Sequence, residues 1–381
     1  MNIIVAPDKF KGSMTAAEAA DNIARGIKSV MPAAKLQLIP LSDGGEGLVD
    51  SLVGSAKGTF MHTVVADPLG SAVKAAWGLV DNGKTAVIEM STASGLTLVP
   101  EEKRNPAIAT TYGTGELIKA ALDYGCTKLI IGIGGSATND GGAGMAQALG
   151  ARFYDQSGHT LNYGGAELLR LDRIDISGLD CRLQNLVTLV ACDVDNPLTG
   201  PLGAARIYGP QKGATPELVD TLDAALSNYA QVVKNDLGIE IDALPGAGAA
   251  GGLGAGLIAF LGAELRSGIE LVLDALQIDD LLPGCNLLIT AEGKLDAQSA
   301  HGKAPVGIAR RAARFGVPVI ALAGSIESEL DQFHSEGLNA CFAIADGPLT
   351  LEQSITRGPE LLRNKTAELL RLWRIASSAV R

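Results

Sequence analysis

The chain has 381 residues, a formal net charge of −11, and a composition that is 47% apolar but only 4% aromatic. At about 150 residues per domain, this length predicts two domains, each with enough apolar residues for its own core. The acidic excess argues against nucleic acid and against an anionic membrane surface as the main partner. A phosphorylated small molecule held by a few lysines remains compatible with it.

Cysteine usage and the N-terminus predict a soluble, cytoplasmic protein. The five cysteines are scattered and contain no Cys-x-x-Cys pair, which is typical of reduced thiols. The opening residues MNIIVAPDKF lack the basic and apolar regions of a signal peptide. The uncharged span 245–263 is long enough for a membrane helix, but its many glycines indicate a glycine-rich loop followed by a buried helix.

The first 50 residues predict a strand–helix–strand unit. A buried strand is expected at 3–5, a helix after the capping box of Thr15 and Glu18, and a second strand at 36–41. Open α/β sheets bind ligands at the carboxyl ends of their strands. Each polar residue at these strand ends, taken alone, is more often a solvated turn residue than a ligand contact. The site candidates of this unit are Asp8, Lys9, Lys11, Asp43 and Glu46.

Residues 62–90 predict antiparallel strands joined by tight turns. Within them, GLVDNGKT at 78–85 matches the Walker A pattern letter for letter. A phosphate loop must join a strand to a helix, whereas Asn82-Gly83 lies between two alternating apolar runs, which is a strong hairpin signal. We therefore predict a hairpin here, with Lys84 as an exposed strand residue.

The stretch 129–150, LIIGIGGSATNDGGAGMAQALG, carries the strongest ligand-binding signal in the chain. It predicts a short buried strand, a polar loop with six glycines between 132 and 144, and a helix start at 145–149. The N–H groups of such a loop, at a helix N-terminus, favour an anion and typically a phosphate. The alternative is a tight turn without a ligand. The predicted phosphate cradle consists of Gly134, Gly135, Ser136, Thr138, Asn139, Gly141 and Gly142.

An apolar strand expected at 186–192 leads directly into Asp193-Val194-Asp195. Two acids at the end of a buried strand suit a metal ion or a catalytic base. If the strand geometry continued to Asp195, both side chains would point to the same side and favour a shared metal site. The alternative for one of them is a turn former before Pro197.

From residue 285 onward, strands expected at 287–289, 317–322 and 341–345 alternate with helices at 306–315 and 361–375. The segment 290–303 follows the first of these strands and is too rich in acids, bases and hydrogen-bond donors for a mere linker. Its site candidates are Glu292, Lys294, Asp296, Gln298, Ser299 and Lys303.

Two short matches leave a nicotinamide enzyme as the second interpretation of the residues. GAGAAG at 246–251 fits the dinucleotide fingerprint, and GIGGSA at 132–137 fits its alanine variant, with Asp155 near the expected ribose-binding position. Both matches are weak alone. The first follows only a short expected strand, and the second is followed by a polar loop rather than a long helix.

Five motifs in order carry a resemblance to a known family: APDKFKGSMTA, PLSDGGEG, IGIGGSATNDGGAGMAQALGA, CDVDNPLTG and AEGKLDAQSAHGKAP. With them the chain resembles bacterial type I glycerate kinases from Met1 to about Ile375. The resemblance implies transfer of the γ-phosphoryl group of ATP to D-glycerate, with Mg²⁺, on a two-domain α/β fold. In the last motif, Ala291 and Lys294 replace the family's Gly and Arg, and lysine lacks the bidentate fork of arginine.

The predicted architecture is α/β with two domains. Residues 1–69 and 285–381 are expected to form a discontinuous Rossmann-like domain with a mostly parallel sheet, and 70–284 an inserted mixed α/β domain that carries the phosphate loop. The ligands are expected in the cleft between them.

The predicted function is a glycerate kinase that forms 2-phosphoglycerate in glyoxylate or sugar-acid breakdown, with ATP and Mg²⁺ and no nucleic-acid or membrane partner. We expect Asp193 to be the base or a Mg²⁺ ligand with Asp195, Asp296 and Lys294 to be further catalytic groups, and Lys9 and Lys11 to contact phosphate. The other candidates would bind substrate: Asp8, Asp43, Glu292, Gln298, Ser299 and Lys303. Open alternatives are 3-phosphoglycerate as product, an NAD-dependent dehydrogenase of a small hydroxy acid, and a non-catalytic sugar-acid sensor. The protein is expected to be a monomer or a homodimer.

Overall fold

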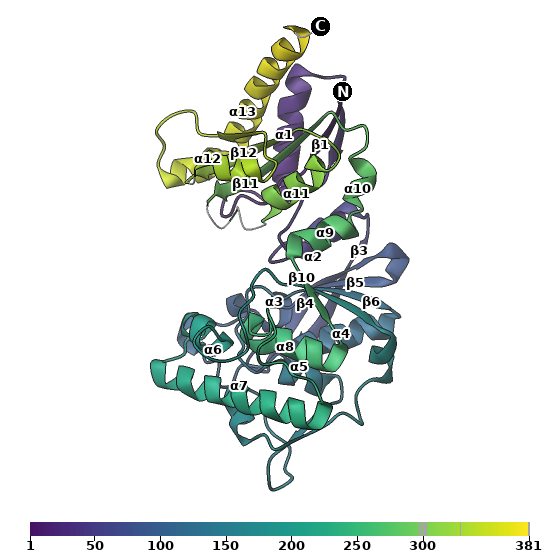
Figure 1. The fold of residues 1–381 in the computed structure, drawn as a ribbon, viewed down its shortest axis with the longest axis vertical. Coiled ribbons are helices and arrows are strands. Elements are labelled where there is room, and N and C mark those ends of the chain that lie inside the picture. Colours follow the sequence, from purple (N-terminus) through teal and green to yellow (C-terminus); the bar gives the residue numbers. More distant parts are fainter. Residues whose placement is uncertain (297–298, 300–302, 328, 380–381) are drawn as a thin grey trace. The chain divides into compact units, whose positions relative to one another are not determined.

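The computed structural model describes residues 1–296, 299, 303–327 and 329–379 (Figure 1). Packing divides the chain into two compact units, Met1–Asp43 with Ile269–Arg381, and Gly44–Gly268. One unit contains a parallel sheet and the other a mixed sheet, and both are combined with helices. The predicted α/β fold class is therefore confirmed.

The first unit is built on a five-stranded sheet in the order β13-β12-β11-β1-β2, with all neighbouring strands parallel. In chain order within the unit this is a 2-1-3-4-5 arrangement, a doubly wound order whose switch point lies between β1 and β11. The strands are β1 (Asn2–Val5), β2 (Lys35–Leu38), β11 (Leu287–Leu295), β12 (Val319–Ile326) and β13 (Ala340–Ala343). The helices are α1 (Ala16–Val30), α9 (Gly268–Ala275), α10 (Ile278–Leu281), α11 (Ala304–Ala313), α12 (Leu330–Ser335) and α13 (Leu351–Ala379).

Helices α1 and α13 lie side by side against this sheet (Figure 1). The capping box predicted for α1 is present, because Thr15 accepts a hydrogen bond from the N–H of Glu18 and the Glu18 carboxylate caps Thr15 in return. Gly26 allows the close approach, since a Cβ there would lie 2.5 Å from the carbonyl oxygen of Arg363 on α13. Ile23 and Ile27 of α1 share one buried core with Ile3 of β1 and with β11.

The second unit contains a six-stranded mixed sheet in the order β10-β9-β6-β5-β4-β3 and a separate antiparallel pair, β7 and β8. The strands are β3 (Thr59–Ala66), β4 (Ala72–Val80), β5 (Thr85–Glu89), β6 (Lys128–Gly132), β7 (Arg152–Tyr154), β8 (Arg173–Asp175), β9 (Val187–Ala191) and β10 (Glu264–Arg266). The α-helices are α2 (Leu48–Ser55), α3 (Ser91–Ser94), α4 (Tyr112–Tyr124), α5 (Ala143–Ala148), α6 (Ala204–Tyr208), α7 (Pro216–Leu237) and α8 (Ala249–Leu261). The short 3₁₀ helices are η1 (Asp81–Gly83), η2 (Leu96–Leu98), η3 (Glu101–Lys103), η4 (Gly165–Arg170), η5 (Cys181–Asn185) and η6 (Pro210–Lys212).

The hairpin predicted at the Walker-like sequence is confirmed. Strands β4 and β5 pair antiparallel, and the turn between them places Asn82 at φ 55°. The sequence therefore joins two strands and cannot wrap a phosphate at a helix N-terminus.

The borders of the two units differ from the predicted borders at 69/70 and 284/285. Strand β3 belongs to the second unit because it pairs along its whole length with β4. Residues 269–284 belong to the first unit, where Ile269 packs against Gly307 and Arg311 pairs with Glu270. The units thus divide at Asp43/Gly44 and at Gly268/Ile269.

One local expectation also differs from the structure. The segment after residue 289 begins as strand, because β11 continues to Leu295 and pairs with β12 as far as Ile326.

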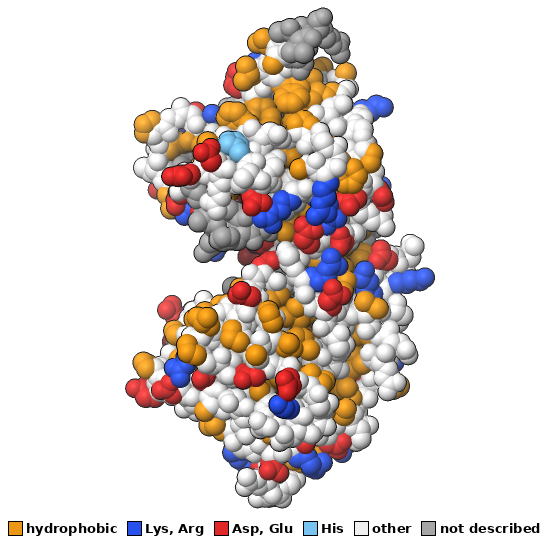
Figure 2. All heavy atoms as spheres, viewed as in Figure 1, with side chains coloured by type: hydrophobic (Ala, Val, Ile, Leu, Met, Phe, Trp, Pro, Cys, Tyr) orange, Lys and Arg blue, Asp and Glu red, His pale blue; other side chains and the backbone are white. Residues whose placement is uncertain are grey.

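Charged side chains of both signs are interspersed over the face shown in Figure 2, among apolar ones. In the described part of the chain, every helix is too short or too polar to cross a membrane. Because charges of both signs are mixed on the face in Figure 2, we locate the candidate site from strand ends and burial rather than from a charged patch.

Candidate active site

The parallel strands of the second unit end in register. Glu89 of β5 pairs with Gly132 of β6, Gly132 with Ala191 of β9, and Ala191 with Arg266 of β10. The segments that follow these strands therefore begin at one edge of the sheet. The glycine-rich loop follows β6 at this edge, and Asp193 follows β9.

The glycine-rich loop, residues 133–142, exposes only its beginning. Gly134 and Gly135 are exposed, and among the described residues their N–H groups have no hydrogen-bond acceptor. The carbonyl of Gly135 accepts a hydrogen bond from the N–H of Leu96 (2.8 Å), and the N–H of Ala137 donates to the carbonyl of Ser94 (3.0 Å). The loop thus holds two adjacent backbone donors in a fixed place and open to solvent.

The rest of the predicted phosphate cradle lies in the interior. Ser136 is 7% exposed, Thr138 and Asn139 are 0% exposed, and Gly141 and Gly142 are buried. Helix α5 is only six residues long, so its dipole adds less to an anion site than the sequence suggested. Within the cradle, solvent-facing contacts are therefore limited to Gly134, Gly135 and the edge of Ser136.

Asp140 holds this loop in place by hydrogen bonds, although no role was predicted for it from the sequence. Its carboxylate accepts hydrogen bonds from Thr111 N–H (2.8 Å) and Oγ1 (2.9 Å), and from the N–H groups of Gly142 and Gly144 (both 3.2 Å). Burial raises the pKa of Asp140, and these hydrogen bonds oppose that shift. The sequence signal that could have revealed Asp140 is its place between Asn139 and two glycines.

Asp193 and Asp195 lie in an exposed segment beyond β9. The strand stops at Ala191, so strand geometry does not align the two side chains as the sequence analysis considered. Asp193 Oδ1 accepts a hydrogen bond from the N–H of Gly268 at 2.8 Å, which anchors the carboxylate.

Glu89, at the end of β5, is a second residue of this edge that was not predicted from the sequence. It is 8% exposed and accepts hydrogen bonds from the N–H groups of Gly47 (3.1 Å) and Val49 (2.9 Å) at the start of α2. Glu89 thus ties α2 to the end of β5. Its position at the end of an apolar run was the only sequence signal.

In the first unit, Asp8 and Glu292 meet at the switch point of the parallel sheet. Asp8 follows β1, and its N–H donates to the carbonyl of Ala291 in β11 at 2.7 Å, directly before Glu292. Doubly wound sheets bind ligands at this point. The two carboxyl groups are only 7% and 6% exposed, and Glu292 Oε1 has no partner among the described residues.

Burial raises the pKa of both carboxyl groups. Desolvation, helped by Asp43, raises the pKa of Asp8 to about 7. Desolvation, helped by Asp8 and Asp296, raises the pKa of Glu292 to about 8. The positive charge of Lys303 opposes both shifts. Strongly shifted carboxyl groups at a strand end are typical of functional sites.

The remaining candidates of this unit surround the pair. Asp296 lies between two ammonium groups, 3.8 Å from Lys294 Nζ and 3.7 Å from Lys303 Nζ. Lys294 is exposed and also pairs with Glu327 (2.6 Å). Ser299 is buried, and its hydroxyl donates to the carbonyl of Lys294.

Four further predicted residues remain. Lys9 donates its N–H to Asp8 Oδ1 (2.6 Å), but its side chain is only half-buried, and Lys11 is exposed. Gln298 lies outside the described residues. Glu46 is exposed and belongs to the second unit.

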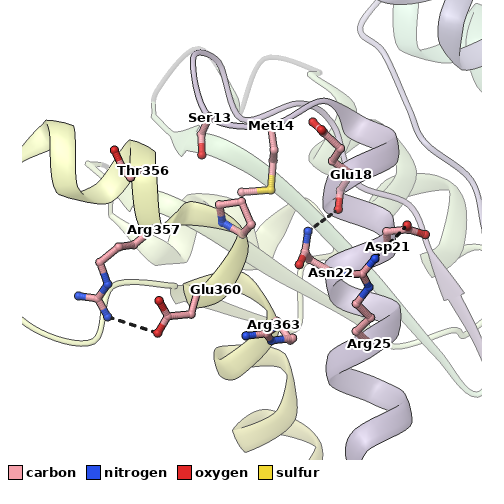
Figure 3. A pocket seen from close by; sticks show the side chains of 11 residues that line it. Ser13, Met14, Glu18, Asp21, Asn22, Arg25, Thr356, Arg357, Glu360 and Arg363 are labelled. Atoms are coloured by element: carbon pink, nitrogen blue, oxygen red, sulfur yellow. Dashed lines mark hydrogen bonds and ion pairs between the residues drawn. The ribbon is translucent and has the colours of Figure 1, made fainter.

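A groove of about 540 Å³ between α1 and α13 is a different feature of the first unit (Figure 3). Four of its charged side chains form ion pairs within the groove: Arg25 with Asp21 (3.9 Å), and Arg357 with Glu360 (3.7 Å). It contains neither the strand ends nor the weakly acidic carboxyl groups, so the switch point is the better candidate site.

The chain is similar to known proteins over nearly its whole length. A model of the glycerate kinase family matches residues 3–374. The chain belongs to this family. A glycerate kinase from Bacillus subtilis is 50% identical over 378 residues, 99% of each chain, and the glycerate 2-kinase of Escherichia coli is 50% identical over 354 residues, 93% of each chain.

A solved structure agrees with this membership. A crystal structure from Salmonella typhimurium, described provisionally as a glycerate kinase 2, matches the kinase with a TM-score of 0.91 at 46% identity over 99% of both chains. The resemblance noted from the five motifs is thereby confirmed, and so is the predicted enzyme class.

Proposed function

We propose that this kinase transfers the γ-phosphoryl group of ATP to D-glycerate and forms 2-phosphoglycerate. The glycerate 2-kinase of Escherichia coli, half of whose aligned residues are identical, supports the substrate and the product. The observation that carries the proposal is the switch point, where Asp8 and Glu292 are buried beside Lys303. A small hydroxy acid needs one cation for its carboxylate and hydrogen-bonding groups for its hydroxyls, and this cluster has both.

We assign glycerate binding to the first unit. The ammonium of Lys303 would face the glycerate carboxylate, and Asp8 and Glu292 would bond its hydroxyls. With pKa values of about 7 and 8, these groups are partly protonated near neutral pH and can both donate and accept hydrogen bonds. Asp43, Ser299 and Gln298 stay proposed as further substrate contacts.

We assign phosphate binding to the second unit. The N–H groups of Gly134 and Gly135, exposed and without an acceptor among the described residues, suit phosphate oxygens. Ser136 would contribute at the edge, whereas Thr138, Asn139, Gly141 and Gly142 would support the loop from the interior. Lys9 and Lys11 stay proposed as phosphate contacts from the first unit.

Asp193 and Asp195 fit a Mg²⁺ ion by the chemistry of their donors. Among the described residues, no group of three or more His, Cys, Asp or Glu side chains is arranged to hold a metal. Mg²⁺ does not require such a cage, because one or two carboxylates with waters and substrate phosphates suffice. When bound, the ion would neutralise charge on the phosphates. The alternative role of Asp193 is that of the base that takes the hydroxyl proton, with Asp296 and Lys294 as its proposed partners.

One assay distinguishes this proposal from the two alternatives. We expect ADP release that requires D-glycerate, ATP and Mg²⁺ together. Reduction of NAD⁺ by D-glycerate would indicate the dehydrogenase instead, and glycerate binding without turnover would indicate the sensor. The dehydrogenase already lacks structural support, because no strand directly precedes the glycines at 246–251 and helix α5 begins only at Ala143.

The cellular setting follows from this activity. We propose that the enzyme acts in the cytoplasm, in glyoxylate or sugar-acid breakdown, as a monomer or a homodimer.

A further inference from the structure

Lys212 is a buried lysine beneath the glycine-rich loop. It ends η6, is 1% exposed, and donates a hydrogen bond from Nζ to the carbonyl oxygen of Thr138 at 2.6 Å. Lysine is almost never fully buried without a partner. Of the described residues of the second unit, Lys212 is the one basic residue classed as buried. Nothing in the sequence marked it.

The surroundings of Lys212 are polar and enclosed. Burial lowers the pKa of Lys212 to about 7, and the carboxylate of Asp140 opposes that shift. Tyr229 packs so tightly that a Cβ on Gly141 would lie 2.7 Å from its ring. The Tyr229 hydroxyl, Thr138 Oγ1 and the Asn139 amide are buried without partners among the described residues. Lys212 therefore brings a hydrogen-bond donor into an otherwise enclosed interior.

The position of Lys212 connects this interior to the exposed end of the loop. One side of the loop is fastened by Ser94 and Leu96, through their backbone hydrogen bonds to Ala137 and Gly135. The other side is fastened by Asp140 and by Lys212 through Thr138. Only three residues separate Thr138 from Gly134. The Thr138 carbonyl and the two exposed N–H groups therefore belong to one short run of backbone.

We propose that Lys212 is a positioning residue of the glycine-rich loop, which holds the carbonyl of Thr138 so that the N–H groups of Gly134 and Gly135 stay in place for phosphate. The phosphate part of this statement rests on the proposed function. The positioning part does not, because it concerns the conformation of the loop itself.

The test compares Lys212→Met with Lys234→Met. Methionine keeps the unbranched shape of lysine and removes the charge and the donor. Lys234 is a matched control in the same unit, since it is 55% exposed and pairs only at the surface with Glu240. Hydrogen exchange of the backbone amides at 133–142 is measured for each, with the β4–β5 hairpin as internal reference. Steady-state kinetics then give KM for ATP and for D-glycerate.

For Lys212→Met we expect loop exchange to become at least ~10-fold faster while the hairpin changes little, because the opening is local. We expect KM for ATP to rise ~10-fold with KM for glycerate unchanged, as loop displacement weakens phosphate contacts alone. Lys234→Met should match the wild type in loop exchange, in KM for ATP and in KM for glycerate. Equal acceleration of loop and hairpin would show a general loss of stability and overturn the proposal, as would unchanged loop exchange.

A second measurement needs no variant. Acetylation of the native wild-type protein by acetic anhydride should modify Lys212 ~10²-fold more slowly than Lys234, because the buried amine reacts only after local opening. Equal rates at the two lysines would overturn the proposal. If the protein lacks kinase activity but Lys212→Met still loosens the loop, the proposed function fails and the positioning role stands.

Discussion

At the scale of the residue, Asp193 is both anchored and exposed. Its carboxylate accepts a hydrogen bond from the N–H of Gly268, so one oxygen is held while the segment around it faces solvent. A general base needs this kind of fixed position, because a displacement of ~1 Å can cost on the order of 10²-fold in rate.

We predict that Asp193→Asn lowers kcat by ~10²–10⁴-fold, the range for loss of a general base. Asparagine keeps the oxygen that Gly268 N–H contacts, so the melting temperature should stay near that of the wild type. Asp195→Asn is the matched control and should mainly raise the Mg²⁺ concentration needed for half-maximal rate. A folded Asp193→Asn enzyme with wild-type kcat would move the base assignment to Asp296.

The buried carboxyl of Asp8 should leave a signature in stability. Burial raises its pKa to about 7 in the folded protein, from 3.8 for the free side chain, so between pH 3.8 and pH 7 the folded state binds more protons than the unfolded state. The protonated carboxyl of Asp8 therefore contributes to the free energy of unfolding at low pH. This contribution, on the order of 4 kcal/mol at most, is lost as the pH rises through 7.

Urea unfolding of the wild type and of Asp8→Asn between pH 4 and pH 8 measures this loss. Asparagine has the same shape but no titration, so the wild type should lose stability relative to the variant as pH rises. Parallel pH profiles for the two proteins would mean that Asp8 titrates normally.

At the scale of the element, the glycine-rich loop depends on its backbone conformation. Gly135 has φ +74°, a left-handed conformation that costs a non-glycine residue about 1–2 kcal/mol. Gly158 has φ +80° in a surface turn with no atom within 4 Å of an added Cβ, so it offers the same strain away from the loop.

We predict that Gly135→Ala raises KM for ATP ~10-fold, because relief of the strain displaces the N–H groups of the loop. Gly158→Ala should lower stability by a similar amount and leave both KM values unchanged. If the two variants had identical kinetics, the loop would not be the phosphate site.

Elements with local signals were predictable from the sequence. The capping box at Thr15 and the turn at Asn82-Gly83 form as the sequence indicated, because each is specified by nearby residues. Strand β11 was predicted too short, since its second half is stabilised by pairing with β12, which lies about 30 residues later.

The candidate site was predictable only in part, for the same reason. Asp8, Glu292 and Lys303 stood out as polar residues near strand ends, and the structure brings them together. Thr138 and Asn139 were chosen by composition alone, and the fold turns both side chains inward. Lys212 is 74 residues from the carbonyl it contacts, so no local pattern could reveal it.

At the scale of the whole molecule, the second unit is one continuous segment, Gly44–Gly268, with a complete six-stranded sheet and its own core. We predict that a fragment of residues 44–268 folds alone, because its strands and the helix α2 are all present. Circular dichroism and cooperative urea unfolding measure this.

The matched control is a fragment of residues 70–284, the division expected from the sequence. It lacks β3 and α2, so β4 would lose one of its two partner strands and its packing against α2. We expect it to be much less stable or to aggregate. If 44–268 failed to unfold cooperatively while 70–284 did, the domain border would lie near residue 70.

The central claim is phosphorylation of glycerate, and ³¹P NMR of the reaction mixture tests it most directly. The protein is incubated with ATP, Mg²⁺ and D-glycerate, and the spectrum separates 2-phosphoglycerate from 3-phosphoglycerate. We predict 2-phosphoglycerate and ADP in equal amounts. 3-Phosphoglycerate would contradict the proposed position of transfer, and the absence of any phosphoglycerate from folded protein would contradict the kinase activity itself.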